Sequence, residues 1–359
     1  MTVRYRAAII GCGRIARAHA NGYSGMEGCE LVSCSDIFPE AAAKLAEEYK
    51  IPRVYTDYRE MLAETRPDLV SICTYHHLHY ELTVGAAAYK PKAIYCEKPM
   101  AMHVSEADEM IRVCRDNGVL LLIGHQRRYG PQYRKAKELL DSGEIGELVH
   151  MECYGHPWSS LFVDGTHSID LLRYYNNDLP VDWVMGQVDV KSGSHRFGHP
   201  NEGASLAMLY FSNGVRAVLT TGGFSPSQAP FPAKDGVALG AEVPPHGYHK
   251  IILHGTRGRL EIDGDDIVQG DTILRIHRGA EVEPIAVDLK KREAFQSALA
   301  DVLASLETGK PHLLHAESGR ATLAVISAIF QSSKERTLVY LHQVQGANPL
   351  YELITDQQP

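Results

Sequence analysis

The sequence lacks the apolar runs that a membrane protein needs. No stretch approaches the roughly 18 to 20 consecutive apolar residues of a spanning helix. Residues 1–6 lead directly into a short strand-like run, without the apolar core of a signal peptide. We therefore expect neither a membrane-spanning segment nor a secretory leader.

Clustered positive charge is also scarce. The 359 residues carry 36 Lys and Arg against 44 Asp and Glu, a formal net charge of −8, and basic runs such as 290–292 are short. Because recognition of a phosphate backbone needs a continuous basic surface, no nucleic-acid partner is expected. The 7 cysteines form no C-x-x-C pair and no regular pattern, which is typical of small buried residues in a reducing cytoplasm.

What is present is an ordinary globular composition, with 44% hydrophobic and 22% charged residues. The length suggests two domains, and the pattern changes after Gly124, so we predict one domain over residues 1–124 and another over 125–359. In the first, short apolar runs alternate with amphipathic stretches, as in strands buried on both faces and joined by crossover helices. The predicted strands span 6–10, 31–35, 69–73, 93–96 and 119–123, with a weak edge strand near Val54.

Right-handed crossovers between such strands predict a doubly wound parallel sheet. One of the crossover helices is predicted over 105–117. Ser105 and Asp108 resemble a capping box at its start, and Gly118 supplies a C-terminal stop.

Antiparallel signals dominate after residue 124. Residues 204–211 and 215–221 flank Asn213-Gly214, a strong β-hairpin signal. Further strands are expected over 147–154, 184–190, 250–254, 259–262 and 272–277, and helices over 133–140, 167–175, 293–306 and 318–332. The prediction is an α+β domain with a large open, mainly antiparallel sheet, whose uncovered face needs a helix layer or a partner subunit.

Two other features belong to this second half. The segment 224–245, rich in Pro, Gly, Ala and Ser, is predicted to be a long loop over one end of the sheet. The last helices are candidates to pack back on the first domain.

A dinucleotide fingerprint follows the first strand. Gly11-Cys12-Gly13-Arg14-Ile15-Ala16 has the G-x-G-x-x-A form of a Rossmann fold, in which backbone amides approach a diphosphate at the positive end of a helix. The second strand ends at Asp36, where a carboxylate can bind both ribose hydroxyls. Ile37 follows in place of a basic residue, so NAD is favoured over NADP, although Arg14 keeps a phosphate partner available.

Ligands of an open parallel sheet lie across the carboxyl ends of its strands, so residues after each strand are the next candidates. They are the segments 74–79 and 124–128 and the triplet Glu97-Lys98-Pro99, and the motif Gly165-x-His167-x-x-Asp170 comes later. In this order, behind a dinucleotide fold, these motifs resemble the Gfo/Idh/MocA oxidoreductases, the family of glucose-fructose oxidoreductase and inositol dehydrogenase. The resemblance covers almost the whole chain.

The resemblance implies that Lys98 lies between the nicotinamide and the substrate, and that His167 faces the reacting carbon as acid and base. Removing a hydride from a secondary alcohol requires loss of the hydroxyl proton, which an imidazole can accept. The Lys98 ammonium would stabilise the developing alkoxide. The cofactor contacts implied in addition are Thr74, Tyr75, His76, His79, Glu97 and Gln126, with Tyr75 and His76 standing where the family usually has Pro and Asn.

One position departs from the family pattern. Many polyol-oxidising members carry an aspartate four positions before the histidine, whereas this chain has Val163 there and Asp164 one position later. Either a local shift of the backbone lets Asp164 serve beside His167, or the enzyme handles a different substrate. Asp170 matches a family acid that either holds the helix or contacts substrate.

Weaker candidates complete the substrate site. Arg127 matches a family position near substrate and nicotinamide, Tyr248 precedes a strand of the second domain, and Trp158 could stack on a sugar ring. The histidines 76, 77 and 79 are close in sequence, but neighbouring positions point to different sides and nothing completes a coordination shell. No metal site is expected.

These features together predict a cytoplasmic, NAD-dependent dehydrogenase of a sugar, sugar derivative or cyclitol. Two alternatives stay open. The same cofactor can act transiently, with oxidation permitting an elimination or glycoside cleavage before reduction restores the alcohol. The fold can also serve a non-catalytic regulator that binds nucleotide. Family resemblance further suggests a homodimer or homotetramer formed through the C-terminal sheet.

Overall fold

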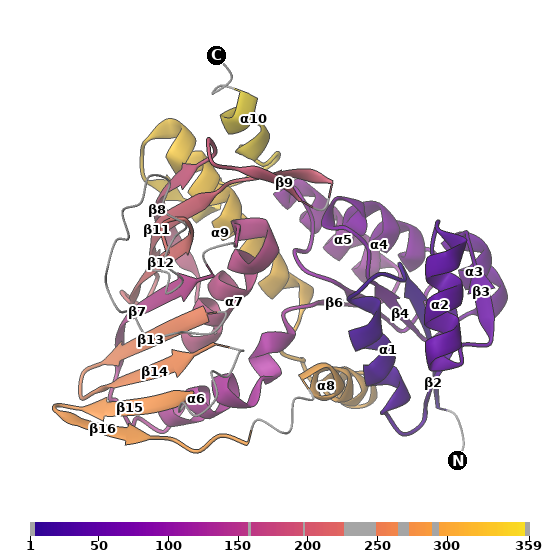
Figure 1. The fold of residues 1–359 in the computed structure, drawn as a ribbon, viewed down its shortest axis with the longest axis horizontal. Coiled ribbons are helices and arrows are strands. Elements are labelled where there is room, and N and C mark those ends of the chain that lie inside the picture. The colour runs from indigo at the N-terminus through magenta and orange to yellow at the C-terminus, as the bar shows by residue number, and fades with distance from the viewer. Residues whose placement is uncertain are drawn as a thin grey trace, which may run out of the picture. The chain divides into compact units, whose positions relative to one another are not determined.

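A computed structural model describes residues 4–156, 159–196, 198–225, 249–264, 273–288 and 294–355. The chain forms two compact units (Figure 1). The first consists of Met1–Tyr129 with Glu293–Leu323, and the second of Gly130–Arg292 with Ala324–Pro359. The segment that contains helix α8 (Ala294–Thr308) therefore belongs to the first unit, although in the sequence it lies between two segments of the second unit.

The first unit contains a six-stranded sheet of order β3-β2-β1-β4-β5-β6. Every pairing in it is parallel, which confirms the predicted doubly wound Rossmann sheet. The strands are β1 (Tyr5–Ile10), β2 (Cys29–Ser35), β3 (Arg53–Tyr55), β4 (Leu69–Ile72), β5 (Ala93–Cys96) and β6 (Leu120–Ile123). The strand order reverses between β1 and β4, and ligands of such sheets bind at this switch point.

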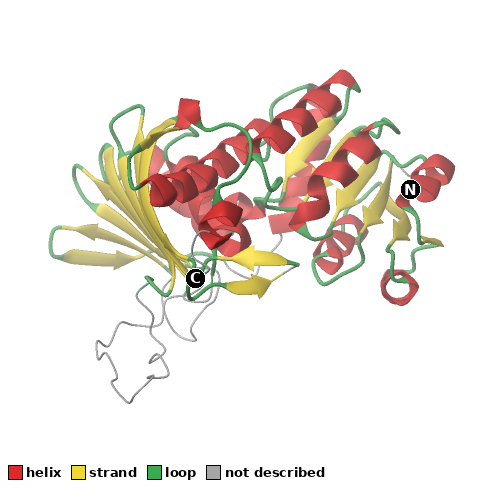
Figure 2. Cartoon of the chain, turned by 90° about the horizontal axis from the view of Figure 1, so that it is seen from above, coloured by secondary structure: helices red, strands yellow, loops and turns green. Residues whose placement is uncertain are grey.

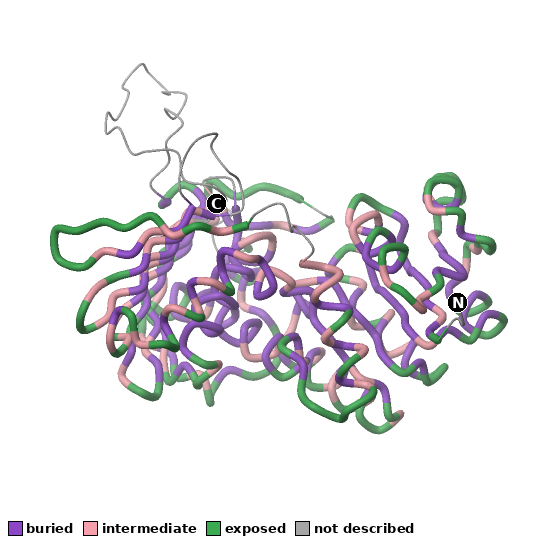
Figure 3. Tube along the Cα trace, turned by 90° about the horizontal axis from the view of Figure 1, so that it is seen from below, coloured by how far each residue is buried: buried purple, intermediate pink, exposed green. Residues whose placement is uncertain are grey.

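Helices connect these strands. They are α1 (Ala16–Ser24), α2 (Pro39–Tyr49), α3 (Tyr58–Thr65), α4 (His79–Ala87) and α5 (Val104–Asp116). All residues of β4 and β5 are buried, as in strands covered on both faces (Figure 3). The predicted capping box of α5 is wrong, because the Glu106 carboxylate accepts the backbone N–H groups of Met102 and His103 and thereby satisfies the start of the helix two residues earlier.

The second unit contains a nine-stranded sheet of order β16-β15-β14-β13-β7-β12-β11-β8-β17. Its strands are β7 (Leu148–Gly155), β8 (Val181–Asp189), β11 (Ala204–Phe211), β12 (Arg216–Gly222), β13 (His249–Gly255), β14 (Arg259–Asp263), β15 (Leu274–Arg278), β16 (Glu281–Pro284) and β17 (Val339–Tyr340). Only the β12–β7 pair is parallel among these pairings, so the prediction of a mainly antiparallel sheet is confirmed. Gly214 has φ +86° in the turn between β11 and β12, which confirms the Asn213-Gly214 hairpin.

Helices lie on one face of this sheet (Figure 2). They include α6 (Pro131–Asp141), α7 (Thr166–Tyr175) and α9 (Ala316–Glu335), of which residues 324–335 belong to the second unit. A Cβ added to Gly186 of β8 would lie 2.9 Å from Cγ2 of Ile329, so the glycine permits the close approach of α9. A last helix, α10, spans Leu350–Thr355.

The two faces of the nine-stranded sheet differ in burial. Along β13, Ile251 and Leu253 on one face are buried, whereas Lys250, Ile252 and His254 on the other face are partly exposed. We call this second side the outer face, and within the described ranges no helix covers it (Figure 2). The period-2 alternation is that of a sheet with one solvated face.

Four short strands were not predicted from the sequence, namely β9, β10, β16 and β17. Ser194–Arg196 (β9) pairs with His199–Asn201 (β10) as a separate hairpin. The long loop predicted over 224–245 lies almost entirely outside the described residues, as do Trp158 and Tyr248.

Candidate cofactor and substrate site

The glycine turn after β1 has the shape of a diphosphate site. Gly11 has φ +87°, and a Cβ there would lie 2.7 Å from Cγ2 of Thr74 and 2.9 Å from the backbone carbon of Cys73. No described atom lies within 4 Å of a Cβ added to Gly13, and the residue is exposed. Gly11 is therefore required by the fold, whereas the absence of a side chain at Gly13 leaves room for a ligand.

Asp36 lies beside this turn. Its carboxylate accepts the backbone N–H of Cys12 at 2.7 Å and that of Phe38 at 2.9 Å. The side chain thus joins the end of β2 to the fingerprint, where a ribose next to the diphosphate would lie. Ile37 follows with 77% of its surface exposed.

The loop after β4 carries the next group of predicted cofactor contacts. Tyr75 is exposed and Thr74 partly exposed, whereas His76 and His79 are buried. Nδ1 of His79 lies 2.8 Å from the carbonyl oxygen of Pro99, and Nε2 lies 3.2 Å from that of Thr74. Burial lowers the pKa of His79. The His79 imidazole therefore links the loops that follow β4 and β5.

The triplet Glu97-Lys98-Pro99 ends β5, and its Lys98–Pro99 peptide bond is cis. Glu97 is 3% exposed, and its carboxylate lies 3.0 Å from Nε2 of His19 and accepts the Lys98 backbone N–H at 3.2 Å. Burial would raise the pKa of this carboxyl, but the hydrogen bond and charge of His19 and the charge of Lys98 outweigh burial and lower it. Glu97 is therefore ionised beside the partly exposed Lys98 side chain.

The turn after β6 contributes Gln126 and Arg127, both partly exposed. The next residue, Arg128, is instead buried and donates to the carbonyl of Leu313 at 3.3 Å and to Oγ of Ser318 at 2.9 Å. Of the two adjacent arginines, Arg127 is thus the one with an accessible side chain.

The second unit carries His167 and Asp164. A wide π-helical turn, Leu161–Gly165, precedes α7, and the Ser160 carbonyl accepts the backbone N–H groups of residues 163, 164 and 165 at 3.1, 3.1 and 2.9 Å. Gly165 and Thr166 have right-handed helical dihedrals, so Asp164 and His167 are i,i+3 neighbours on one helical segment. His167 is 3% exposed and Asp164 partly exposed.

Residues that the sequence analysis missed hold this turn in place. A carboxyl oxygen of Glu202 accepts the backbone N–H of Leu161, and Oγ of Ser160 donates to Oδ1 of Asn201 at 2.9 Å. Desolvation raises the pKa of Glu202 to about 8. The only signal in the sequence was a pair of polar residues, 201–202, which Gly203 separates from the start of β11.

The structure thus brings together, in the first unit, the glycine turn, Asp36, and the loops that carry Thr74, His79 and Lys98. Asp164 and His167 come together in the second unit. Because Lys98 and His167 belong to different units, their approach to one substrate stays a prediction. In the part of the chain that the structure describes, no three His, Cys, Asp or Glu residues form a group that could hold a metal ion.

None of the described helices has the length and apolar character to cross a bilayer.

Comparison with known proteins agrees with this geometry. Residues 5–125 match the model of the oxidoreductase family with an NAD-binding Rossmann fold, and residues 133–261 match the GFO/IDH/MocA C-terminal domain. A myo-inositol 2-dehydrogenase of Thermotoga maritima is 23% identical over 357 residues, which cover 95% of this chain and 100% of the relative. A D-glucoside 3-dehydrogenase of Escherichia coli is 35% identical over 144 residues, 40% of this chain and 41% of the relative.

Solved structures share the fold. An oxidoreductase from Agrobacterium radiobacter, crystallised with NAD+, L-tartaric acid and magnesium, superposes with a TM-score of 0.77 at 18% identity, covering 94% of this chain and 98% of the other. With both family models matched in sequence order, the chain belongs to the Gfo/Idh/MocA family of oxidoreductases and carries that family's NAD-binding Rossmann domain.

Proposed function

We propose that this protein is an NAD-dependent dehydrogenase that oxidises a secondary alcohol of a sugar, sugar derivative or cyclitol. The observation that carries the proposal is the arrangement at the switch point of the first sheet. There the open glycine turn, the Asp36 carboxylate and the ionised Glu97 next to Lys98 all lie at the carboxyl ends of neighbouring strands. The names of the inositol and glucoside dehydrogenases among the relatives support the substrate class.

The chemistry follows from the residues. Bound NAD supplies a ring carbon that accepts a hydride. His167 takes the hydroxyl proton of the substrate, and the C–H electron pair leaves with the hydride, so a ketone forms. Lys98 stabilises the negative charge that develops on the oxygen during this step.

Asp164 is proposed to assist His167. As its i,i+3 neighbour, a carboxylate at this position can favour the imidazolium that forms when His167 accepts the proton. The proposed substrate contacts also include Arg127, Trp158 and Tyr248. The two aromatic residues lie outside the described ranges.

NAD is proposed over NADP. The Asp36 carboxylate would repel a 2′-phosphate, and the exposed neighbour Ile37 offers no positive charge to bind one. The same carboxylate can accept hydrogen bonds from two free ribose hydroxyls.

A screen of sugars, polyols and glycosides with NAD and NADP tests the proposal, provided that both cofactor reduction and substrate loss are followed. NADH formation with one substrate class is the expected result. Substrate loss without NADH would instead favour transient oxidation followed by elimination. NAD binding without any turnover across the panel would favour a regulator.

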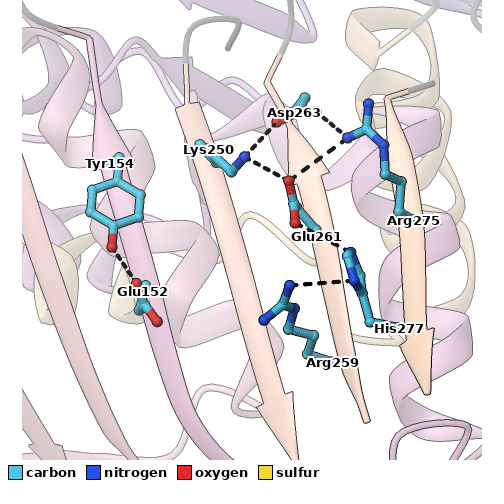
Figure 4. A network of polar contacts seen from close by, with 8 residues as sticks. All are labelled: Glu152, Tyr154, Lys250, Arg259, Glu261, Asp263, Arg275 and His277. Carbon is cyan, nitrogen blue, oxygen red and sulfur yellow. Dashed lines mark hydrogen bonds and ion pairs between the residues drawn. The ribbon is translucent and has the colours of Figure 1, made fainter. Parts of the chain in front are cut away.

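We also propose that the outer face of the C-terminal sheet joins two copies of the chain. On β8 and β11 it carries Met185, Leu206 and Met208, which are 54%, 45% and 38% exposed. On β13, β14 and β15 it carries a network of both charge signs (Figure 4). In that network Lys250 contacts Glu261 at 2.6 Å and Asp263 at 3.6 Å.

Such a face suits a second copy of itself. A two-fold interface brings the same patch from both subunits together, so an apolar area beside paired charges is self-complementary. The charges are largely neutralised within the sheet, because Arg275 also contacts Asp263 and His277 lies 3.3 Å from Glu261 (Figure 4).

A further inference from the structure

A buried histidine on α1 connects the cofactor helix to the strand end that carries Lys98. His19 is 0% exposed, and its ring packs edge-on against Tyr95 and Phe295, with centroids 4.7 Å apart in each case. Both ring nitrogens have polar partners. Nδ1 lies 2.9 Å from Oγ of Ser71, and Nε2 lies 3.0 Å from Oε1 of Glu97.

These contacts form a buried hydrogen-bonded chain. The Tyr23 hydroxyl lies 2.7 Å from Oγ of Ser71, which in turn bonds His19 and thereby reaches Glu97. A carboxylate has no hydrogen to give, so Nε2–H of His19 donates to Glu97 whether the imidazole is neutral or charged. The series of hydrogen bonds therefore ends with the donation from His19 to the Glu97 carboxylate, next to Lys98.

The pocket around Glu97 leaves the carboxylate little freedom. A Cβ added to Gly124 would lie 2.9 Å from Oε1 of Glu97 and 3.1 Å from its Cδ, so a larger residue there would displace the carboxylate. The other oxygen accepts the Lys98 backbone N–H at 3.2 Å. His19, Lys98 and His79 lower the pKa of Glu97, and, in addition to burial, the charge of Glu97 in turn raises the pKa values of Cys73, Tyr95 and Cys96.

We propose that His19 is a positioning residue for catalysis: it fixes the Glu97 carboxylate, and through that carboxylate it fixes the backbone of Lys98 and keeps a negative charge beside the Lys98 ammonium. The inference rests on the proposed function, in which Lys98 stabilises the alkoxide. It assigns to His19 no contact with substrate or cofactor. Its effect passes entirely through Glu97.

Two substitutions of His19 separate its two hydrogen bonds. In His19→Gln the amide nitrogen can take the place of Nε2 and keep the donor to Glu97. In His19→Asn the amide reaches only as far as Nδ1, so the bond to Ser71 is kept and the donor to Glu97 is lost. Ser33→Ala is the matched control, because it removes a buried hydroxyl that lies 3.2 Å from Oγ1 of Thr65 in the same unit.

The expected result is a difference between these variants. His19→Asn lowers kcat about tenfold or more, as for loss of a hydrogen bond to a charged group, and leaves the dissociation constant of NAD within about threefold. The basic limb of its kcat/KM profile moves to lower pH, because the Glu97 carboxylate is no longer held beside the Lys98 ammonium and stabilises its charge less. His19→Gln restores most of kcat, and Ser33→Ala changes neither quantity.

A double-mutant cycle and a chemical probe complete the test. With Glu97→Gln already present, His19→Asn should cause little further loss, because its target is gone. Acetic anhydride labelling of Lys98, followed by mass spectrometry across pH, should reach half-labelling at lower pH in His19→Asn and Glu97→Gln than in the wild type. This labelling needs no substrate, so it decides the inference even if no dehydrogenase activity is found.

The inference is overturned if His19→Asn behaves like Ser33→Ala in kcat, pH profile and Lys98 labelling. Failure of the proposed function looks different. If Lys98→Ala keeps wild-type turnover, the assignment of Lys98 is wrong, whereas an inactive Lys98→Ala with an unaffected His19→Asn removes only the role of His19.

Discussion

At the scale of single residues, Lys98 and His167 carry the sharpest prediction. Lys98→Ala and His167→Ala should each lower kcat/KM by roughly 10²- to 10⁴-fold, since one removes the charge proposed to stabilise the alkoxide and the other removes the proposed proton acceptor. The dissociation constant of NAD should change by less than about threefold, because neither residue is proposed to hold the diphosphate or ribose. Steady-state kinetics and calorimetric titration measure the two effects.

Exposed residues of the same type serve as controls. Lys44→Ala on α2 and His195→Ala on β9 should keep wild-type turnover. Turnover near the wild-type value in Lys98→Ala or His167→Ala would remove that residue from the mechanism.

Asp36 decides the choice of cofactor in a second prediction. Asp36→Ala should weaken NAD binding about tenfold, because the ribose loses a charged acceptor, and should weaken NADP binding less, because the repulsion of its phosphate is also lost. Titrations with both cofactors give the ratio, and Glu40→Ala, an exposed acid on α2, is the control. An unchanged ratio in Asp36→Ala would show that the ribose lies elsewhere.

The sequence was informative about residues whose role is local. The fingerprint, Asp36 and the triplet 97–99 were found because each motif is continuous or lies at a strand end. His19 and Glu202 were missed because their partners are distant: His19 is separated from Ser71 by 52 positions and from Glu97 by 78. A weak signal was available, since His19 lies one helical turn after Ala16 on the face that meets the sheet.

At the scale of secondary-structure elements, the turn before α7 makes a prediction through Glu202. Burial raises the pKa of Glu202 to about 8 from an ordinary value of 4.5. The folded chain therefore binds this proton more tightly than the unfolded chain. The contribution of Glu202 to the free energy of unfolding is then fully present below about pH 4.5, falls as the pH rises toward 8, and is lost above it.

Glu202→Gln removes this titration and keeps an oxygen to accept the Leu161 N–H. Its Tm relative to the wild type should therefore rise between pH 5 and pH 8.5, by roughly 2–4 °C for each kcal/mol of penalty removed. Thermal unfolding across pH measures this difference in Tm. Asn201→Asp cannot serve as the control variant, because it adds a charge at the same turn. A constant difference in Tm from pH 5 to 8.5 would mean that Glu202 is ionised throughout.

Elements with strong local signals were predicted well. The Asn213-Gly214 hairpin and the strand β11 (Ala204–Phe211) are confirmed. The π-helical turn at 161–165 was not predicted, because its geometry depends on Ser160, Asn201 and Glu202 rather than on a pattern of its own residues.

At the scale of the whole molecule, the outer face predicts an oligomer. Leu206→Arg places a charge in the exposed apolar patch and should shift the protein from dimer or tetramer toward monomer, because the buried charge would have no partner in a symmetric interface. Light scattering after size-exclusion chromatography measures the mass. Glu47→Arg, an exposed position on α2, should leave the mass unchanged. A wild-type monomer, or a Leu206→Arg oligomer of unchanged mass, would contradict the proposed interface.

The order of strands in the nine-stranded sheet could not be predicted from the sequence. Successive antiparallel strands such as β13, β14 and β15 can be predicted from neighbouring runs, whereas β16 was not predicted. The position of β7 between β12 and β13 arises from pairing across long stretches of chain, which no local pattern records. The open antiparallel sheet was therefore predictable as a class, and its topology was not.

The first unit also contains a segment from the C-terminal part of the sequence, Glu293–Leu323. Leu299 of α8 lies where a Cβ on Gly22 would be 2.9 Å away, Phe295 packs on His19, and the Leu314 carbonyl accepts the N–H of Ile123 at 3.0 Å. A ribosome therefore releases residues 1–129 long before the helix that completes their core has been translated. If residues 1–129 alone were fused to another enzyme, apolar side chains of α1 and β6 would be exposed to solvent. A chimaera that keeps this core intact must also include residues 294–323.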